Sequence, residues 1–378
     1  MIIVEKFVAG KEVKHSTGYF YFLPNPINQQ WVWENQTINK LLEKAAIKLG
    51  ELNSYSKLVP NIDLFIQLHV TKEAVVSSRI EGTRTQMDEA LLGKDEISPE
   101  RKNDWQEVNN YINALNQAIT DLEKLPLSSR LIREAHSTLL NSVRGERKQP
   151  GEFRISQNWI GGNSLLDAVF IPPNQDHVTD LISDLEKFLH NDDISVPVLI
   201  KIAIAHYQFE TIHPFLDGNG RIGRLLITLF LVDQKILDKP LLYLSAFFEK
   251  NKGLYYDNLS FVRTKNDMIQ WLKYFLVGVA ETAENATETL SNVLALKVKI
   301  ENQISTSFGK RSVKASIILQ ELFKKPVIHV NQVKDILKSS YKTANELVND
   351  LVVAGILKEM TGQERNRIFV FDDYIKLF

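Results

Sequence analysis

The sequence predicts a mainly α-helical protein with a β-hairpin inserted between helices and a winged-helix domain at its C-terminal end. Three observations predict this fold class. Apolar residues recur at helical spacing along most of the 378 residues. Two short β-type runs flank Gly161 and Gly162, as strands flank the turn of a hairpin. After about residue 310 the order is helix, helix, turn, helix and hairpin, which is typical of a winged helix.

The elements divide the chain into four expected parts. Residues 1–35 lack helical periodicity and contain prolines, which indicates an irregular arm. We expect an N-terminal region over 1–89, a helical core over 90–285, a connecting helix over 286–309 and the winged helix over 310–378. Periodic apolar positions predict helices over 37–52, 62–78, 103–122, 128–140, 177–189, 200–210, 225–232, 255–262, 268–281 and 286–307.

Composition narrows the class of protein. A hydrophobic content of 44% and a charged content of 24% are ordinary for a soluble globular protein. The absence of cysteine excludes disulfides and thiolate chemistry. No apolar run is long enough to span a membrane, and Glu5 and Lys6 interrupt the apolar start of the chain, unlike a signal peptide. We therefore expect a cytoplasmic protein with no membrane partner.

The most informative stretch is 213–224, His-Pro-Phe-Leu-Asp-Gly-Asn-Gly-Arg-Ile-Gly-Arg, a polar loop between two apolar helices. A buried polar loop must satisfy its groups through a ligand or through itself. Glycines at 218 and 220 let backbone N–H groups approach an anion closely. Those N–H groups start the second helix, and a helix N-terminus favours anions.

The charged side chains of the loop complete this chemistry. Arg221 and Arg224 are three residues apart, so they share a helix face and can hold phosphate oxygens. Asp217 is suited to the Mg²⁺ that accompanies a nucleotide polyphosphate. His213, at the end of the preceding helix, is suited to take a proton from an attacking hydroxyl. The residue types thus indicate phosphate-directed group transfer with a histidine base.

The residues alone allow two other interpretations of the loop. The arginines could pair with carboxylates in a purely structural helix-loop-helix. Alternatively, His206, His213 and Asp217 could bind a metal, since the two histidines are two helical turns apart. This metal set lacks a third strong ligand, and His206 is more simply a residue that packs or orients the loop.

The loop resembles, at every defined position, the motif HPFx[D/E]GNGRxxR of the Fic family. The resemblance implies a protein adenylyltransferase that moves AMP from ATP to a Ser, Thr or Tyr hydroxyl of a target protein and of itself, and it suggests a homodimer. His213 would be the general base, Asp217 the Mg²⁺ ligand and Arg224 the γ-phosphate ligand. Tyr243 and Asn251 fall where Fic proteins often carry residues that face the adenosine. The implied nucleotide-binding residues are Gly218, Asn219, Gly220, Arg221, Ile222, Gly223, Arg224, Tyr243 and Asn251.

A second stretch, Ser77-Ser-Arg-Ile-Glu81-Gly82, ends the helix predicted over 62–78. By its local pattern it is an ordinary helix end with Gly82 as the cap. It also matches [S/T]xxxE[G/N], the inhibitory motif of Fic proteins with an N-terminal inhibitory helix. By this resemblance Glu81 pairs with Arg224 through a bidentate contact, Ser77 braces the glutamate, and ATP binds only in a poorly reactive pose.

The predicted hairpin near residue 161 resembles the Fic flap that lies over the active site. There, a strand edge would pair with an extended segment of the target and align its hydroxyl. Trp159, Ile160 and Gly161 are the candidate edge residues. A hairpin without target contacts is the alternative.

The C-terminal unit offers a weaker signal for DNA binding. In 296–378, 14 Lys and Arg residues face 9 Asp and Glu residues, a local excess of +5 that is below what strong DNA binders usually show. The recognition helix would be 341–354, with Arg365 and Arg367 on the wing. DNA is therefore a possible partner that the sequence does not favour, and a protein contact is the alternative. Two functional alternatives also remain: transfer or removal of a nucleotide at the same site, and a nucleotide-sensing DNA-binding regulator.

Overall fold

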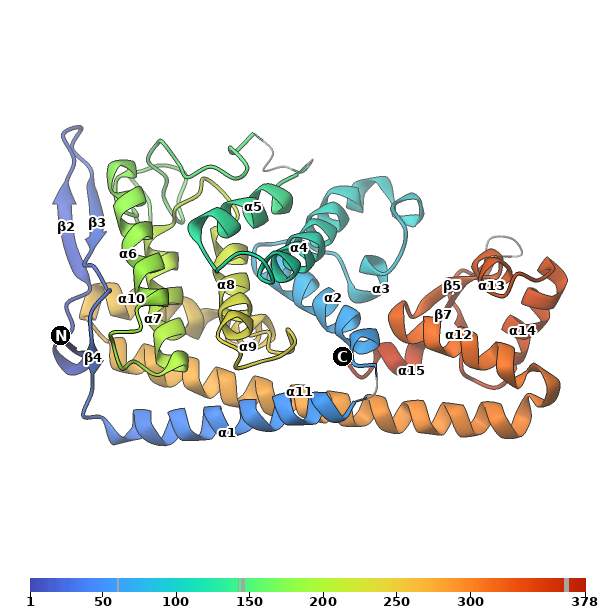
Figure 1. Ribbon diagram of the computed structural model, residues 1–378. Helices are drawn as coiled ribbons and strands as arrows, with labels where there is room; N and C mark the ends of the chain where they lie inside the picture. Colours follow the sequence, from blue (N-terminus) through green and yellow to red (C-terminus); the bar gives the residue numbers. More distant parts are fainter. Residues whose placement is uncertain (60, 142, 144–146, 364–366) are drawn as a thin grey trace.

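The computed structural model describes residues 1–59, 61–141, 143, 147–363 and 367–378. The protein is mainly helical and elongated, with a helical body at one end and the C-terminal unit at the other (Figure 1). Within the described ranges, no helix combines the length and the apolar character needed to cross a membrane. The longer helices are α1 (Gln36–Leu58), α2 (Asp63–Ile80), α4 (Lys102–Asp121), α5 (Ser129–Leu139), α6 (Val178–His190), α7 (Val198–Ile212), α8 (Asn219–Asp233), α10 (Lys252–Lys265), α11 (Met268–Ser307), α12 (Ser312–Lys324) and α14 (Tyr341–Val353); the shorter ones are α3 (Met87–Ala90), α9 (Ser245–Lys250), α13 (Val330–Ile336) and α15 (Asp372–Ile375).

Helices α7 and α8 form the centre of the body. Every residue from Leu199 to Ile212 is buried, and so is every residue from Arg221 to Leu231. A helix that is apolar on all sides must be covered on all sides, and here α4, α5, α6 and α11 pack against this pair. The loop 213–218 joins the two helices and is thereby held inside the body.

Helix α11 is one continuous element, which corrects the expectation of a separate connecting helix over 286–309. It runs along the length of the molecule, and α1 lies beside its first part (Figure 1). The polar residues Glu281, Glu284 and Asn285, between the two predicted helices, lie on its exposed face. Its buried stripe continues through Ala286 and Leu290, so no break occurs.

The N-terminal segment is also more regular than expected. Instead of an irregular arm it contains an antiparallel hairpin of β2 (Gly10–Lys14) and β3 (Phe20–Pro24), and a parallel pair of β1 (Ile2–Ile3) with β4 (Trp31–Val32). Phe22 N of β3 donates to Ile171 O at 2.9 Å. This hydrogen bond attaches the N-terminal hairpin to the segment that precedes α6.

The predicted β-hairpin near residue 161 is reduced to a single antiparallel bridge between Ile160 and Phe170. Gly161 and Gly162 have φ values of +69° and +71°, which only glycine adopts at low cost. Asp167 accepts hydrogen bonds from the backbone N–H groups of residues 163 and 164 and closes the turn. The turn is thus correctly predicted, but its flanking runs do not form regular strands.

The C-terminal unit contains α12, α13, α14, α15 and a sheet of strand order β5-β7-β6, built from β5 (Val327–His329), β6 (Lys358–Glu359) and β7 (Ile368–Val370). This element order is the one expected for the winged helix, whose assignment stays a prediction. The unit packs on α2: the ring centroids of Phe65 and Phe323 are 5.3 Å apart, and those of His69 and Phe378 are 4.6 Å apart. Of the predicted wing residues, Arg365 lies outside the described residues.

Candidate active site

The loop between α7 and α8 is closed by its own side chains. His213 ends α7 with a left-handed backbone (φ +51°), and Gly218 begins α8 with φ +77°. The buried Asn219 side chain pairs with the backbone of Phe215 in both directions: its Oδ1 accepts from Phe215 N and its Nδ2 donates to Phe215 O, each at 2.8 Å. Asn219, predicted to hold phosphate, therefore shapes the loop with its side chain.

His136 of α5 and Asn158 of the flap also hold the loop in place. The sequence prediction gave neither residue this role. Gly151 N donates to His136 Nδ1 at 2.9 Å, so His136 Nε2 carries the hydrogen and donates to Asp217 O at 3.0 Å. Asn158 Nδ2 donates to Phe215 O at 2.9 Å. The loop conformation is thus fixed by groups distant in sequence.

Arg154 ties the flap to the end of α7. This buried side chain donates from Nε to His213 O at 2.9 Å and from Nη2 to Pro173 O and Ile212 O. Burial lowers the pKa of Arg154 to about 10, so it remains charged at neutral pH. The buried guanidinium thus links the flap to the loop through backbone carbonyl oxygens on both.

His213 has the properties of a base. Burial, together with the nearby charge of Arg154, lowers the pKa of His213 to about 4, so its imidazole is neutral at pH 7. The residue keeps part of its surface accessible. A neutral, accessible imidazole can accept a proton from a bound hydroxyl.

Gly220 lies in the first turn of α8, where backbone N–H groups have no partner inside the helix. A Cβ at this position would lie 2.4 Å from Glu81 Oε1. The Glu81 carboxylate therefore occupies the start of α8, the place at which an anion is favoured. A ligand phosphate and Glu81 would compete for the same space.

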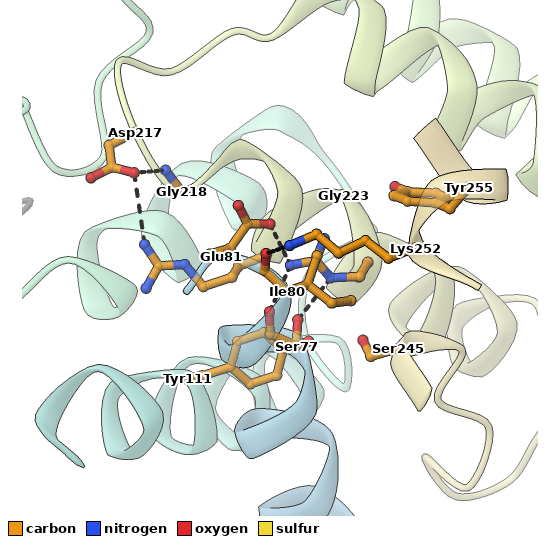
Figure 2. A network of polar contacts seen from close by, with 12 residues as sticks. Ser77, Ile80, Glu81, Tyr111, Asp217, Gly218, Gly223, Ser245, Lys252 and Tyr255 are labelled. Atoms are coloured by element: carbon orange, nitrogen blue, oxygen red, sulfur yellow. Dashed lines mark hydrogen bonds and ion pairs between the residues drawn. The ribbon is translucent and has the colours of Figure 1, made fainter. Parts of the chain in front are cut away.

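Arg224 connects α8 to the end of α2. Its Nη2 donates to Glu81 Oε1 at 2.7 Å and to Ser77 O at 2.9 Å, and its Nε donates to Ser77 Oγ at 2.9 Å (Figure 2). The contact between Glu81 and Arg224 is thus present, but through one carboxylate oxygen and not in the expected bidentate form. Ser77 braces the arginine and not the glutamate, which corrects its expected role.

The charges of this pair support each other. Burial favours the neutral acid at Glu81, but the charge and the hydrogen bond of Arg224, together with the charge of Arg221, outweigh burial and lower the pKa of Glu81. Burial likewise opposes the charge of Arg224, and the Glu81 carboxylate raises its pKa. Both side chains are therefore ionised at neutral pH.

Arg221 turns away from Arg224. Its Nη1 lies 3.3 Å from Glu107 Oε2 of α4, and its Nη2 lies 3.8 Å from Asp217 Oδ1. Asp217 Oδ1 also accepts from Gly218 N at 2.6 Å. The Asp217 side chain is 46% exposed, so this carboxylate remains open to solvent and to a ligand.

The remaining motif residues pack inside the body. Ile222 is a core residue, and a Cβ at Gly223 would lie 2.2 Å from Glu210 Oε1. Burial raises the pKa of Glu210 to about 7. His206 contacts Gly223 O through Nδ1 and Tyr255 OH through Nε2, so it orients α8 instead of joining a metal site. Among the described residues, no group of three or more His, Asp or Glu side chains is arranged to hold a metal.

The two residues expected to face the adenosine are not placed together. Tyr243 is buried and lines a cavity between α2, α9 and α11 that no residue of the 213–224 loop lines. Asn251 donates from Nδ2 to Phe247 O at 2.9 Å and lies at the junction of α9 and α10. Two residues of α10 near Glu81, Lys252 and Tyr256, are absent from the sequence prediction. Lys252 Nζ donates to Ile80 O at 2.7 Å (Figure 2). Burial together with the Glu81 charge raises the pKa of Tyr256 to about 12.

The flap presents an accessible edge. Trp159 is 40% exposed, and Ile160 forms its bridge with Phe170, whose ring lies 4.0 Å below the Arg263 guanidinium. Gly161 supplies the turn. The edge residues are thus held on one side and exposed on the other.

The predicted recognition helix carries paired charges. Arg311 contacts Glu346 Oε2 at 2.8 Å and Asp350 Oδ2 at 2.5 Å on the outer face of α14. Arg367 donates to Asn345 Oδ1 at 2.9 Å. These acidic and neutralised groups do not add to the case for a DNA-binding helix.

Comparison with known proteins gives matches over the same part of the chain. The Fic/DOC family N-terminal domain matches residues 39–120, and the Fic/DOC family domain matches residues 126–231. A protein named protein adenylyltransferase Fic from Drosophila erecta is 33% identical over 123 residues, which are 32% of this chain and 22% of that protein. The protein of the same name from Drosophila melanogaster matches equally, so the chain aligns with about a fifth of the length of these relatives.

A solved structure extends the likeness to almost the whole chain. The crystal structure of a Fic family protein from Desulfovibrio desulfuricans G20 has a TM-score of 0.56 at 19% sequence identity and covers 91% of this chain and 98% of its own. At this identity the likeness concerns the fold alone. With both family domains matched and the motif loop between buried α7 and α8 inside the second match, residues 39–231 belong to the Fic/DOC family.

Proposed function

We propose that this protein is a nucleotidyltransferase that moves AMP from ATP to a Ser, Thr or Tyr hydroxyl of a target protein and of itself. The observation that carries the proposal is the juxtaposition, at the junction of α7 and α8, of a neutral imidazole at His213, the N-terminus of α8 and the buried Arg224. The names of the Drosophila relatives support the same activity.

The chemistry follows from these groups. The target hydroxyl oxygen forms a bond to the α-phosphorus while its proton passes to His213, and the bond from the α-phosphorus to the bridging oxygen breaks to release pyrophosphate. Backbone N–H groups at the start of α8 stabilise the charge that develops on the phosphate oxygens. Arg221, and Arg224 once Glu81 has left it, would hold the remaining phosphates.

Mg²⁺ fits the one open carboxylate of the loop. Oxygen ligands are those Mg²⁺ prefers, and it is commonly held by one or two carboxylates together with substrate phosphates. Asp217, with its half-exposed side chain, is the residue that would hold it. The ion would supply neutralisation of the leaving pyrophosphate.

We further propose that Glu81 keeps the enzyme in a low-activity state. Its carboxylate engages Arg224 and lies over Gly220, in the space that a γ-phosphate would need. Activation then requires the end of α2, or the Glu81 side chain, to leave this position. In the proposed reaction, the flap edge near Trp159 and Ile160 aligns the target hydroxyl for transfer of AMP.

The test is incorporation of label from α-³²P-ATP in the presence of Mg²⁺. We expect little labelling by the wild type, a strong increase in Glu81→Gly, and loss of that increase in Glu81→Gly with His213→Ala. No labelling of the protein or of lysate proteins by any variant would overturn the transferase proposal. Parallel reactions with GTP, CTP and UTP distinguish AMP transfer from transfer of another nucleotide, and an adenylylated protein as substrate tests AMP removal.

A further inference from the structure

A cavity lies beside α2, the helix that ends at Glu81. Its volume is about 180 Å³, and it is lined by α2, the segment before α9, α9 itself and α11. No residue of the 213–224 loop lines it. An engineered apolar cavity of about 150 Å³ takes up benzene, so this one has room for a ring with a small substituent.

The lining of the cavity combines apolar and polar side chains, and Lys72 is its half-buried cation. Val76, Leu241 and Phe247 supply apolar and aromatic surface. Lys72 on α2 is half-buried, and burial lowers its pKa. A half-buried ammonium gains stability from an anion that reaches it.

Lys72 forms no ion pair within the described residues, although the charge of the adjacent Glu73 opposes the larger effect of burial on the Lys72 pKa. The buried Glu73 carboxyl instead accepts hydrogen bonds from Tyr111 OH at 2.9 Å and Ser245 Oγ at 2.5 Å, and burial raises its pKa to about 7. Glu281 is on the exposed rim, opposite the exposed Lys250. His69 is buried, and desolvation lowers its pKa to about 3, so it adds no charge at neutral pH.

Two buried polar groups of the lining residues have no hydrogen-bond partner within the described part of the chain: Tyr243 OH and His69 Nε2. Buried polar groups are rarely left without a partner, and such groups call for an explanation. A ligand with oxygen atoms that seats beside these residues would provide one.

We propose that this cavity is a binding site for a small carboxylate with an apolar, benzene-sized body, held by Lys72. The ring would contact Val76 and Phe247, and the carboxylate would reach the ammonium at the α2 wall. A cationic ligand of the same shape would meet Lys72 with like charge, and a neutral one would lack the ion pair.

The site is connected to the inhibitory contact through α2. Glu73, in its wall, is hydrogen-bonded to Tyr111, whose hydroxyl also interacts with the Ser77 side chain. Ser77 in turn accepts from Arg224 (Figure 2). A ligand that fills the cavity stabilises α2 in its present position, because α2 supplies one wall of the cavity and the ligand binds only the conformation in which that wall is present. On the proposed function, on which this step rests, the ligand strengthens inhibition by Glu81.

Benzoate is the probe, with benzamide as the neutral and benzylamine as the cationic analogue. Titration calorimetry and ligand-observed NMR on the full chain should give saturable benzoate binding near 1 mM, at least tenfold tighter than for either analogue. Thr282→Trp, which fills the cavity from α11, should abolish binding. Thr287→Trp, on the same helix but outside the lining, is the matched control and should retain it.

Lys72→Met keeps the apolar stem and should weaken benzoate at least tenfold while leaving benzamide unchanged. Absence of saturable benzoate binding to the folded wild type, or equal binding by Thr282→Trp, would overturn the site. Tighter binding of benzylamine would overturn the choice of ligand charge.

The coupling has its own readout. Benzoate should lower residual AMP labelling by the wild type at least twofold and leave Glu81→Gly unchanged. Binding with unchanged wild-type labelling overturns the coupling and leaves the site. If no variant labels at all, the proposed function fails, while the binding data still decide whether the site exists.

Discussion

Ser77 Oγ of α2 lies 2.9 Å from Arg224 Nε of α8, so the arginine and not the glutamate receives its support. We predict that Ser77→Ala removes this acceptor from a buried guanidinium and lowers the free energy of unfolding by about 1–3 kcal/mol. Urea denaturation at pH 7 measures it.

Ser78→Ala is the matched control for that measurement. Ser78 is the adjacent buried serine, and its Oγ has no hydrogen-bond partner within the described residues. Its loss should change the free energy of unfolding by less than about 0.5 kcal/mol. Equal losses in the two variants would mean that burial of a hydroxyl at this helix, and not the bond to Arg224, sets the effect.

The motif loop could be predicted because its chemistry is local in sequence. His213, Asp217 and Gly218 all lie within the loop 213–218, and the buried helices on both sides hold that loop inside the body. The contact of Glu81 with Arg224 came from resemblance, since no spacing rule links residues 143 positions apart.

What the sequence did not reveal depends on non-local geometry. The loop-holding bonds of His136 and Arg154 and the placement of Tyr243 beside the cavity between α2, α9 and α11 are set by packing directions that periodicity does not encode. The sequence prediction ends one helix at residue 281 and begins the next at 286, whereas α11 continues through this stretch with its polar residues on the exposed face.

Burial of His206 predicts a pH-dependent stability. Desolvation lowers its pKa in the folded protein to about 3, below the ordinary value of 6.5, so the unfolded chain takes up a proton that the folded chain does not. The stability contributed by neutral His206 is full above pH 6.5 and is lost as the pH falls. Between pH 7.5 and pH 5 the loss is about 2 kcal/mol.

His206→Gln isolates this contribution. The variant should be less stable than the wild type at pH 7.5, and the difference should shrink by about 2 kcal/mol at pH 5. Other titrating groups, including Glu73 and Glu210 with pKa values of about 7, affect both proteins alike and cancel in the difference. A difference that is constant with pH would contradict the prediction.

Gly223 is required by the side chain that faces it. An added Cβ would lie 2.2 Å from Glu210 Oε1 and 3.2 Å from Phe209 Cδ1. Gly223→Ala should therefore lower the free energy of unfolding by about 1–3 kcal/mol. The cost should fall when it is combined with Glu210→Ala, and a double-mutant cycle in urea measures this coupling.

Gly253→Ala provides the contrast, because nothing lies within 4 Å of a Cβ added there in α10. This change should stabilise the protein by about 0.5–1 kcal/mol, the usual gain for alanine over glycine in a helix. A loss at Gly223 that Glu210→Ala does not reduce would show that Phe209, and not the carboxyl group, limits the space.

Asp217→Asn tests the proposed Mg²⁺ ligand in the Glu81→Gly background. Asparagine keeps an oxygen that can accept from Gly218 N, now 2.6 Å from Asp217 Oδ1, but it removes the charge that a hard cation prefers. AMP labelling should fall at least tenfold at low Mg²⁺ and recover in part as Mg²⁺ is raised, because the ion then binds through the nucleotide phosphates. Asp193→Asn, an exposed acid outside the loop, should label as the parent does. A tenfold loss that is the same at every Mg²⁺ concentration would assign Asp217 to loop geometry instead of to the metal.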